Sequence, residues 1–214
     1  MFYFLDLLGT FAFAVTGAYK AKGAKLHIFG VIFLGIITAV GGGTFRDLAI
    51  GRIPLFYFQD PNYLLVAILA GMIIYLVPTF FAKKYSFFRL IDSIGLAAFV
   101  IIGVSISNSF LFGGEGWSLA SFLVSVFMGM TTGFGGGIIR DAIMGGVPLS
   151  LKHGSNYALS AFWGSVSFYV INLFDAEAAI VVSFLITLFL REIISKYGIY
   201  KKLSGKQTEE NGKK

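Results

Sequence analysis

Long apolar stretches alternate with short polar connections along the whole chain. A helix needs about 20 mostly apolar residues to cross the hydrocarbon core of a membrane, and seven stretches meet or approach that length. We therefore predict an all-α membrane protein with seven transmembrane helices, at residues 2–18, 27–49, 62–81, 90–109, 117–144, 156–174 and 178–196.

The polar connections sort by charge onto two sides. Basic residues gather in the connections after the first, third, fifth and seventh stretches, whereas the opposite connections hold Arg52 and four carboxylates. Cytoplasmic connections carry the excess of lysine and arginine in membrane proteins. This pattern predicts an N-terminus outside and a C-terminus inside, with a polar cytoplasmic tail at residues 198–214.

Composition strengthens the membrane assignment. Hydrophobic residues make up 57% of the 214 residues and charged residues 13%, against about 45–50% and 25% in soluble domains. With no cysteine and two histidines, a structural metal site is not expected, and neither is a cofactor or an enzyme. The net charge of +6 lies at loop ends and in the tail, so we expect contacts with membrane lipids and no nucleic acid partner.

The chain repeats itself. At an offset of 94 residues the segment from residue 38 to residue 75 matches a later one at Thr38/Thr132, Arg46/Arg140, Asp47/Asp141, Gly51/Gly145, Pro54/Pro148 and Tyr75/Tyr169. The first spans match at an offset of 86, as at Asp6/Asp92. Because each unit has three spans, the second lies upside down relative to the first. We predict units at residues 1–82 and 83–175, an inverted 3+3 repeat typical of transporters, followed by a seventh helix at residues 176–197.

Three consecutive glycines lie within each middle span: Gly41, Gly42, Gly43, Gly135, Gly136 and Gly137. Each glycine inside a helix costs roughly 1 kcal/mol relative to alanine. One reason to accept the cost is close packing of two helix backbones. The other is a kink or unwound turn, whose freed carbonyl oxygens would line a cavity and bind a transient monovalent cation. We favour the kink, because hydroxyl groups lie nearby at Thr38, Thr44, Thr131 and Thr132.

An Arg-Asp pair follows each triplet, at Arg46-Asp47 and at Arg140-Asp141. Neighbouring residues do not face each other on a helix, so we expect each Arg to pair with the Asp of the other unit. The alternative is a cap at the helix end, before the proline turn. Asp6 and Asp92 lie near span starts, where carboxylates favour a helix N-terminus.

The doubled Gly-Gly-Gly-x-x-Arg-Asp signature, followed by Gly-x-x-Pro, resembles prokaryotic members of the trimeric intracellular cation (TRIC) channel family over about residues 2–195. The same module also resembles a bacterial glycine-transporter domain. The resemblance implies a homotrimer whose protomers each conduct potassium and sodium ions through kinked second and fifth helices. It also implies pore or kink roles for the two triplets and the two Arg-Asp pairs.

Two functions remain open. The first is a monovalent cation channel in a bacterial or archaeal plasma membrane. The alternative is a secondary transporter of a small zwitterion such as glycine, whose carboxylate and amine would meet arginine and aspartate. Animal TRIC channels carry a lysine-containing motif where this chain reads Gly-Gly-Thr-Phe-Arg-Asp, so their lipid and calcium regulation is not expected here.

Overall fold

A computed structural model describes residues 1–76, 85–114, 116–152 and 156–197, without the side chains of residues 85–86 and 193–197. Several sequence expectations fall outside these residues. They are the end of the third predicted span, the boundary between the two units at residues 82 and 83, and the polar tail at residues 198–214.

The described residues form helices and connecting loops. The long helices are α1 (Phe2–Gly23), α2 (Ile28–Ile50), α4 (Asn62–Leu76), α6 (Tyr85–Phe112), α7 (Leu119–Ile143), α8 (Tyr157–Asn172) and α9 (Ala176–Tyr197). Two short helices follow the proline turns, α3 (Phe56–Gln59) and the 3-10 helix η1 (Leu149–Leu151). Every predicted span therefore coincides with a long helix in the described part of the chain.

Some helices continue past the apolar stretch that predicted them. α1 ends at Gly23, beyond the predicted end at residue 18. Its last turn carries Lys20 and Lys22, which both donate hydrogen bonds to other helices. The ammonium group of Lys22 donates to the carbonyl oxygen of Ile74 at 3.1 Å and to that of Tyr75. These carbonyls belong to the last turn of α4, where a cation satisfies acceptors that have no partner within the helix.

The long helices include clear membrane spans. Among the described residues, α1, α2, α6 and α7 are long and apolar enough to cross a membrane, and α4 is a shorter apolar helix. The chain is thus an all-helical membrane protein. The crossing of the membrane by all seven helices, and their orientation, remain predictions.

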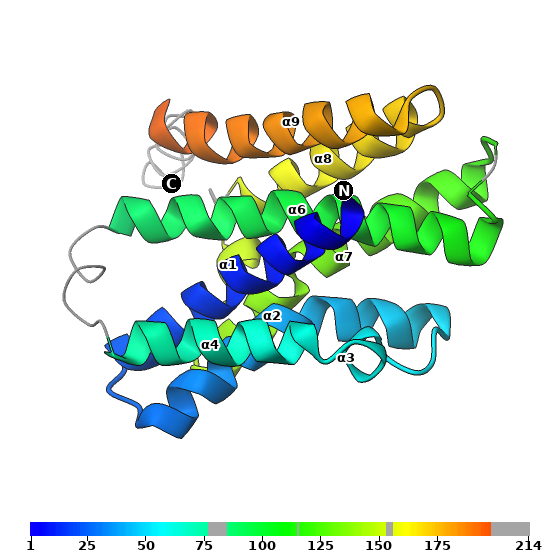
Figure 1. Ribbon diagram of the computed structural model, residues 1–214. Coiled ribbons are helices and arrows are strands. Elements are labelled where there is room, and N and C mark those ends of the chain that lie inside the picture. Colours follow the sequence, from blue (N-terminus) through cyan, green and yellow to red (C-terminus); the bar gives the residue numbers. More distant parts are fainter. Residues whose placement is uncertain (77–84, 115, 153–155, 198–214) are drawn as a thin grey trace, which may run out of the picture.

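The helices pack in two groups of three. α1, α2 and α4 contact one another, as do α6, α7 and α8, while α9 covers α6 and α8. The groups meet where α1 packs against α6 and α2 packs against α7. Figure 1 shows α1 and α6 running in opposite directions along the molecule, with the end of α4 and the start of α6 at the same end.

Glycine ends the middle helix of each group at the same point of the repeat. Gly51 has a φ of 74° and Gly145 a φ of 69°, a left-handed conformation that glycine adopts without strain. The next amide then folds back: the N–H of Arg52 donates to the carbonyl of Asp47 at 2.8 Å, and that of Gly146 to Asp141 at 2.9 Å. Such bonds close a helix and explain the repeated glycine.

Candidate functional site

The two middle helices touch backbone to backbone at the glycine triplets. A Cβ atom placed on Gly42 would overlap the carbonyl oxygen of Thr132 in α7, and one on Gly136 would overlap that of Thr38 in α2. A Cβ on Gly135 would lie 3.1 Å from the Cα of Gly42. The glycines therefore permit a helix crossing that any side chain would prevent.

The predicted unwound turn is wrong, whereas a kink at the triplets stays a prediction. α2 and α7 are helical through both triplets, which are fully described. Carbonyl oxygens that were expected to be free are therefore held in the helical ladder. Contact between the two backbones, the alternative considered from the sequence, accounts for Gly41, Gly42, Gly135 and Gly136.

The four threonines expected at this site use their hydroxyl groups within their own helices. Thr38 donates to Leu34 at 2.6 Å, and Thr132 donates to Met128 at 2.6 Å. Thr44 and Thr131 donate in the same way to carbonyls one turn earlier. Hydroxyl bonds of this type often bend a helix.

The first charge cluster consists of Asp6, Arg46, Asp47, Arg52 and Tyr63. The guanidinium of Arg46 contacts Asp47 Oδ1 at 2.7 Å, and both side chains are at most 2% exposed. Arg52 lies 3.4 Å from Asp47 Oδ2. From α4, the Tyr63 hydroxyl donates to Asp6 of α1 at 2.9 Å. Two arginines and two carboxylates thus lie in this cluster, with the Arg52 side chain 27% exposed.

The second charge cluster consists of Lys20, Asp92, Arg140, Asp141 and Arg191. Arg140 Nε and Lys20 Nζ each lie 2.7 Å from Asp141 Oδ1. Asp92 of α6 lies 3.4 Å from Arg140 and 3.7 Å from Arg191. Helices α1 and α9 therefore supply cations that have no counterpart in the first cluster.

The expected pairing between units is wrong. Each Arg contacts the Asp that follows it, at 2.8 Å for Arg46 Nε and 2.7 Å for Arg140 Nε. The arginine side chain is long enough to fold back, although neighbouring positions diverge on a helix. The second carboxylate oxygens accept backbone N–H groups beyond the proline turns, Phe56 at 3.3 Å for Asp47 and Leu149 at 3.0 Å for Asp141.

Asp6 and Asp92 do not act at helix N-termini. α1 and α6 have no acidic residue in their first turns, and the two carboxylates are buried at 8% and 6% exposure. Their partners come from other helices, so tertiary packing decides their role.

A cavity of about 310 Å³ opens beside the second charge cluster. Its lining includes five basic residues, Lys20, Arg89, Arg140, Lys152 and Arg191, and two acidic ones, Asp92 and Asp141. Lys20, Arg140 and Arg191 are paired within the second charge cluster, and Arg89 contacts Glu192 at 2.9 Å. The ion pairs thus offset most of the positive charge around the cavity.

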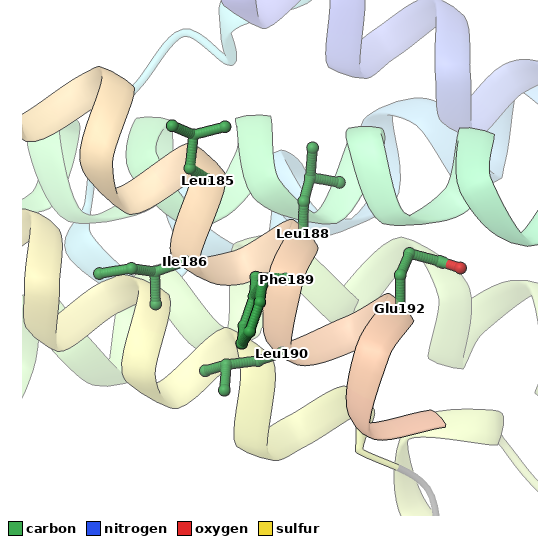
Figure 2. Close-up of a pocket in the computed structure, with 6 residues that line it drawn as sticks. All are labelled: Leu185, Ile186, Leu188, Phe189, Leu190 and Glu192. Atoms are coloured by element: carbon green, nitrogen blue, oxygen red, sulfur yellow. The ribbon is translucent and has the colours of Figure 1, made fainter. Parts of the chain in front are cut away.

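A second hollow lies on the surface of α9 and has a different character. Figure 2 shows its lining side chains, all of which project from this one helix: Leu185, Ile186, Leu188, Phe189, Leu190 and Glu192. Phe189 and Leu185 are more than half exposed. Such an apolar surface suits contact with lipid and provides no polar group for a ligand except Glu192, which is bonded to Arg89 and Ser93 of α6.

The sequence did not predict the contacts of several residues of the charge clusters. Asp6, Asp92 and Tyr63 carried a signal, because all three match at the repeat offsets. Lys20 was assigned only to topology, and Arg191 lies outside the repeat. No pattern in the sequence brings α1 and α9 to the Arg-Asp pair of α7.

The chain matches a family model described as Glycine transporter, over residues 3–79 and 89–172. A curated relative from Escherichia coli (strain K12), the UPF0126 inner membrane protein YadS, is 35% identical over 216 residues, covering 99% of both chains. The predicted location in a plasma membrane is therefore confirmed.

Solved structures share the fold over almost the whole chain. The TRIC trimeric intracellular cation channel orthologue from Rhodobacter sphaeroides superposes with a TM-score of 0.83 at 30% identity, covering 92% of this chain and 98% of that one. A second structure, of a TRIC cation channel, gives a TM-score of 0.80 at 32% identity and covers 92% and 94% of the two chains.

Proposed function

We infer the function from the family, because this chain belongs to the Glycine transporter family of membrane proteins and has the fold of TRIC channels. We propose that it is a passive channel for monovalent cations, potassium and sodium. The observation that carries the proposal is the similarity to the Rhodobacter sphaeroides cation channel over 92% of this chain.

The proposed assembly is a homotrimer with one pore in each protomer. Seven helices cross the membrane as an inverted 3+3 repeat plus α9, with the N-terminus outside and the C-terminus in the cytoplasm. Supporting this orientation, Lys20 of α1 and the residues Arg89, Lys152 and Arg191 surround one cavity. That cavity would then face the cytoplasm.

The proposed conduction path follows α2 and α7 and passes both charge clusters. An unpaired arginine in a narrow path would repel cations. Arg46 and Arg140 are each paired with the adjacent aspartate, so their charge is offset before an ion arrives. The glycine triplets hold α2 and α7 together at their crossing, and the threonine hydroxyl bonds favour a bend on either side of it.

The channel is tested by potassium release from proteoliposomes. Vesicles loaded with potassium and containing the purified protein should lose it faster than protein-free vesicles, and replacing external sodium by a large organic cation should slow the exchange. Release at the protein-free rate would contradict the proposal.

The cavity also favours a second candidate, a transporter of a small zwitterion. Its volume of about 310 Å³ exceeds that of an amino acid as small as glycine, and it offers Arg140 to a carboxylate and Asp92 to an amine. The family description points to the same substrate. Saturable uptake of radiolabelled glycine into the same proteoliposomes would support this candidate and count against a passive pore.

A further inference from the structure

Phe56 fills the space beside the first charge cluster. Its ring lies on Gly43 so closely that a Cβ on that glycine would be 2.7 Å from the ring edge. The same ring contacts Tyr63 edge to face at 4.7 Å between centroids and lies 5.7 Å from the Arg46 guanidinium. The N–H of Phe56 donates to Asp47, so backbone and side chain both fix this ring.

The matching place in the second unit is open. Gly137 matches Gly43, and a Cβ there would meet only Arg140 Nη2 at 3.7 Å and Tyr157 Oη at 3.9 Å among the described residues. At the repeat offset, Phe56 corresponds to Ser150. A cavity instead borders the Arg140-Asp141 pair.

We propose that Phe56 closes the end of the conduction path at the first charge cluster in this conformation, so that the protein is here open to water at one end and shut at the other, and conducts when the ring moves aside. The inference rests on the proposed channel function and adds the residue that blocks the path.

The physical basis is the chemistry of the ring. A hydrated cation passes a narrow site only if water or polar groups replace its hydration shell, and an apolar constriction prevents this by excluding water. Phe56 is 8% exposed and stands at the one place where Gly43 leaves room for a ring. In the second unit no ring of a described residue occupies that position.

The test is potassium release from proteoliposomes containing F56S. This variant replaces Phe56 by serine, the residue at the matching position of the second unit, Ser150. Release should be at least tenfold faster than with the wild-type protein. F58S is the matched control, because Phe58 lies on the same short helix and is 70% exposed. Its rate should stay within twofold of the wild type.

A second variant distinguishes loss of a ring that blocks the path from general loosening of the fold. The Cβ of residue 43 points at the ring position, so a leucine there can occupy the space that F56S vacates. F56S/G43L should release potassium within threefold of the wild-type rate. A rate that remains as high as that of F56S would show loosening and overturn the proposal.

Two failures can be told apart. If the wild-type protein conducts and F56S conducts at the same rate, Phe56 is not the block, although the channel function stands. If neither protein releases potassium faster than empty vesicles, both proposals fall. Should F56S not purify as a folded protein, F56L serves instead, with an expected increase of about threefold and an unchanged rate as the contrary result.

Discussion

At the scale of single residues, burial decides what each ion pair contributes. Asp141 is 2% exposed and accepts three bonds, from Arg140, Lys20 and the Leu149 N–H. Lys20 shares this carboxylate but is 44% exposed at the rim. Removal of the carboxylate leaves a buried guanidinium with less compensation, whereas removal of the lysine leaves the main pair in place.

We therefore expect Asp141→Asn to lower the free energy of unfolding by about 3 kcal/mol, the low end for breaking a buried ion pair. Lys20→Met should lower it by less than about 1 kcal/mol, as for exposed pairs. Titration of the purified protein with a denaturing detergent, followed by circular dichroism, measures both. Equal losses would contradict the difference in burial.

A second residue-scale prediction concerns the partners of the arginines. Because Arg46 pairs with Asp47 and Arg140 with Asp141, exchanging Arg46 and Asp141 should rescue nothing. The double variant R46D/D141R should be at least as unstable as either single variant in the detergent titration. Recovery to near wild-type stability would show that Arg46 does pair with Asp141 of the other unit, and would contradict the structure.

The sequence predicted these charged positions but not their contacts. The repeat singled out Arg46, Asp47, Arg140 and Asp141, since matching charges inside apolar spans are rare. Their partners depend on how the arginine side chain folds and on which helices pack nearby, and neither follows from spacing along one chain.

At the scale of helices, the main feature is the crossing of α2 and α7, where the two backbones are in contact. Sequence located it, because the triplets occur at one repeat register. It favoured a kink or unwound turn over close packing, although glycine suits both. The short helices α3 and η1 were not predicted either, since three or four residues after a proline turn carry no apolar periodicity.

The crossing predicts opposite effects for two neighbouring glycines. Gly136→Ala should destabilise the protein by about 1–3 kcal/mol, because its methyl group would overlap the Thr38 carbonyl and push the helices apart. Gly137→Ala should be neutral or stabilising by up to about 1 kcal/mol, because the methyl has room and alanine favours helix. Thermal unfolding of the two variants in detergent compares them directly, and equal losses would argue against backbone contact.

At the scale of the whole molecule, the sequence predicted most of the architecture. All seven apolar stretches coincide with long helices in the described chain, because length and hydropathy dominate in a membrane. What it missed is the asymmetry between the halves. The cavity at the second charge cluster arises from α1, α6, α7 and α9 together, whereas in the first unit the Phe56 ring packs on Gly43.

The proposed homotrimer predicts a particle of three 23.3 kDa chains. Native mass spectrometry of detergent-purified protein should show a mass of about three chains, with monomer appearing only after denaturation. A monomer or dimer under gentle conditions would contradict the trimer, although it would leave a pore within each protomer possible.

Passive cation conduction is tested by single-channel recording in a planar bilayer under a potassium chloride gradient. A cation channel should give discrete current steps, up to three equal levels from one trimer, that reverse near the equilibrium potential of potassium. Reversal near the chloride potential, or a silent bilayer together with saturable glycine uptake by the same preparation, would contradict it.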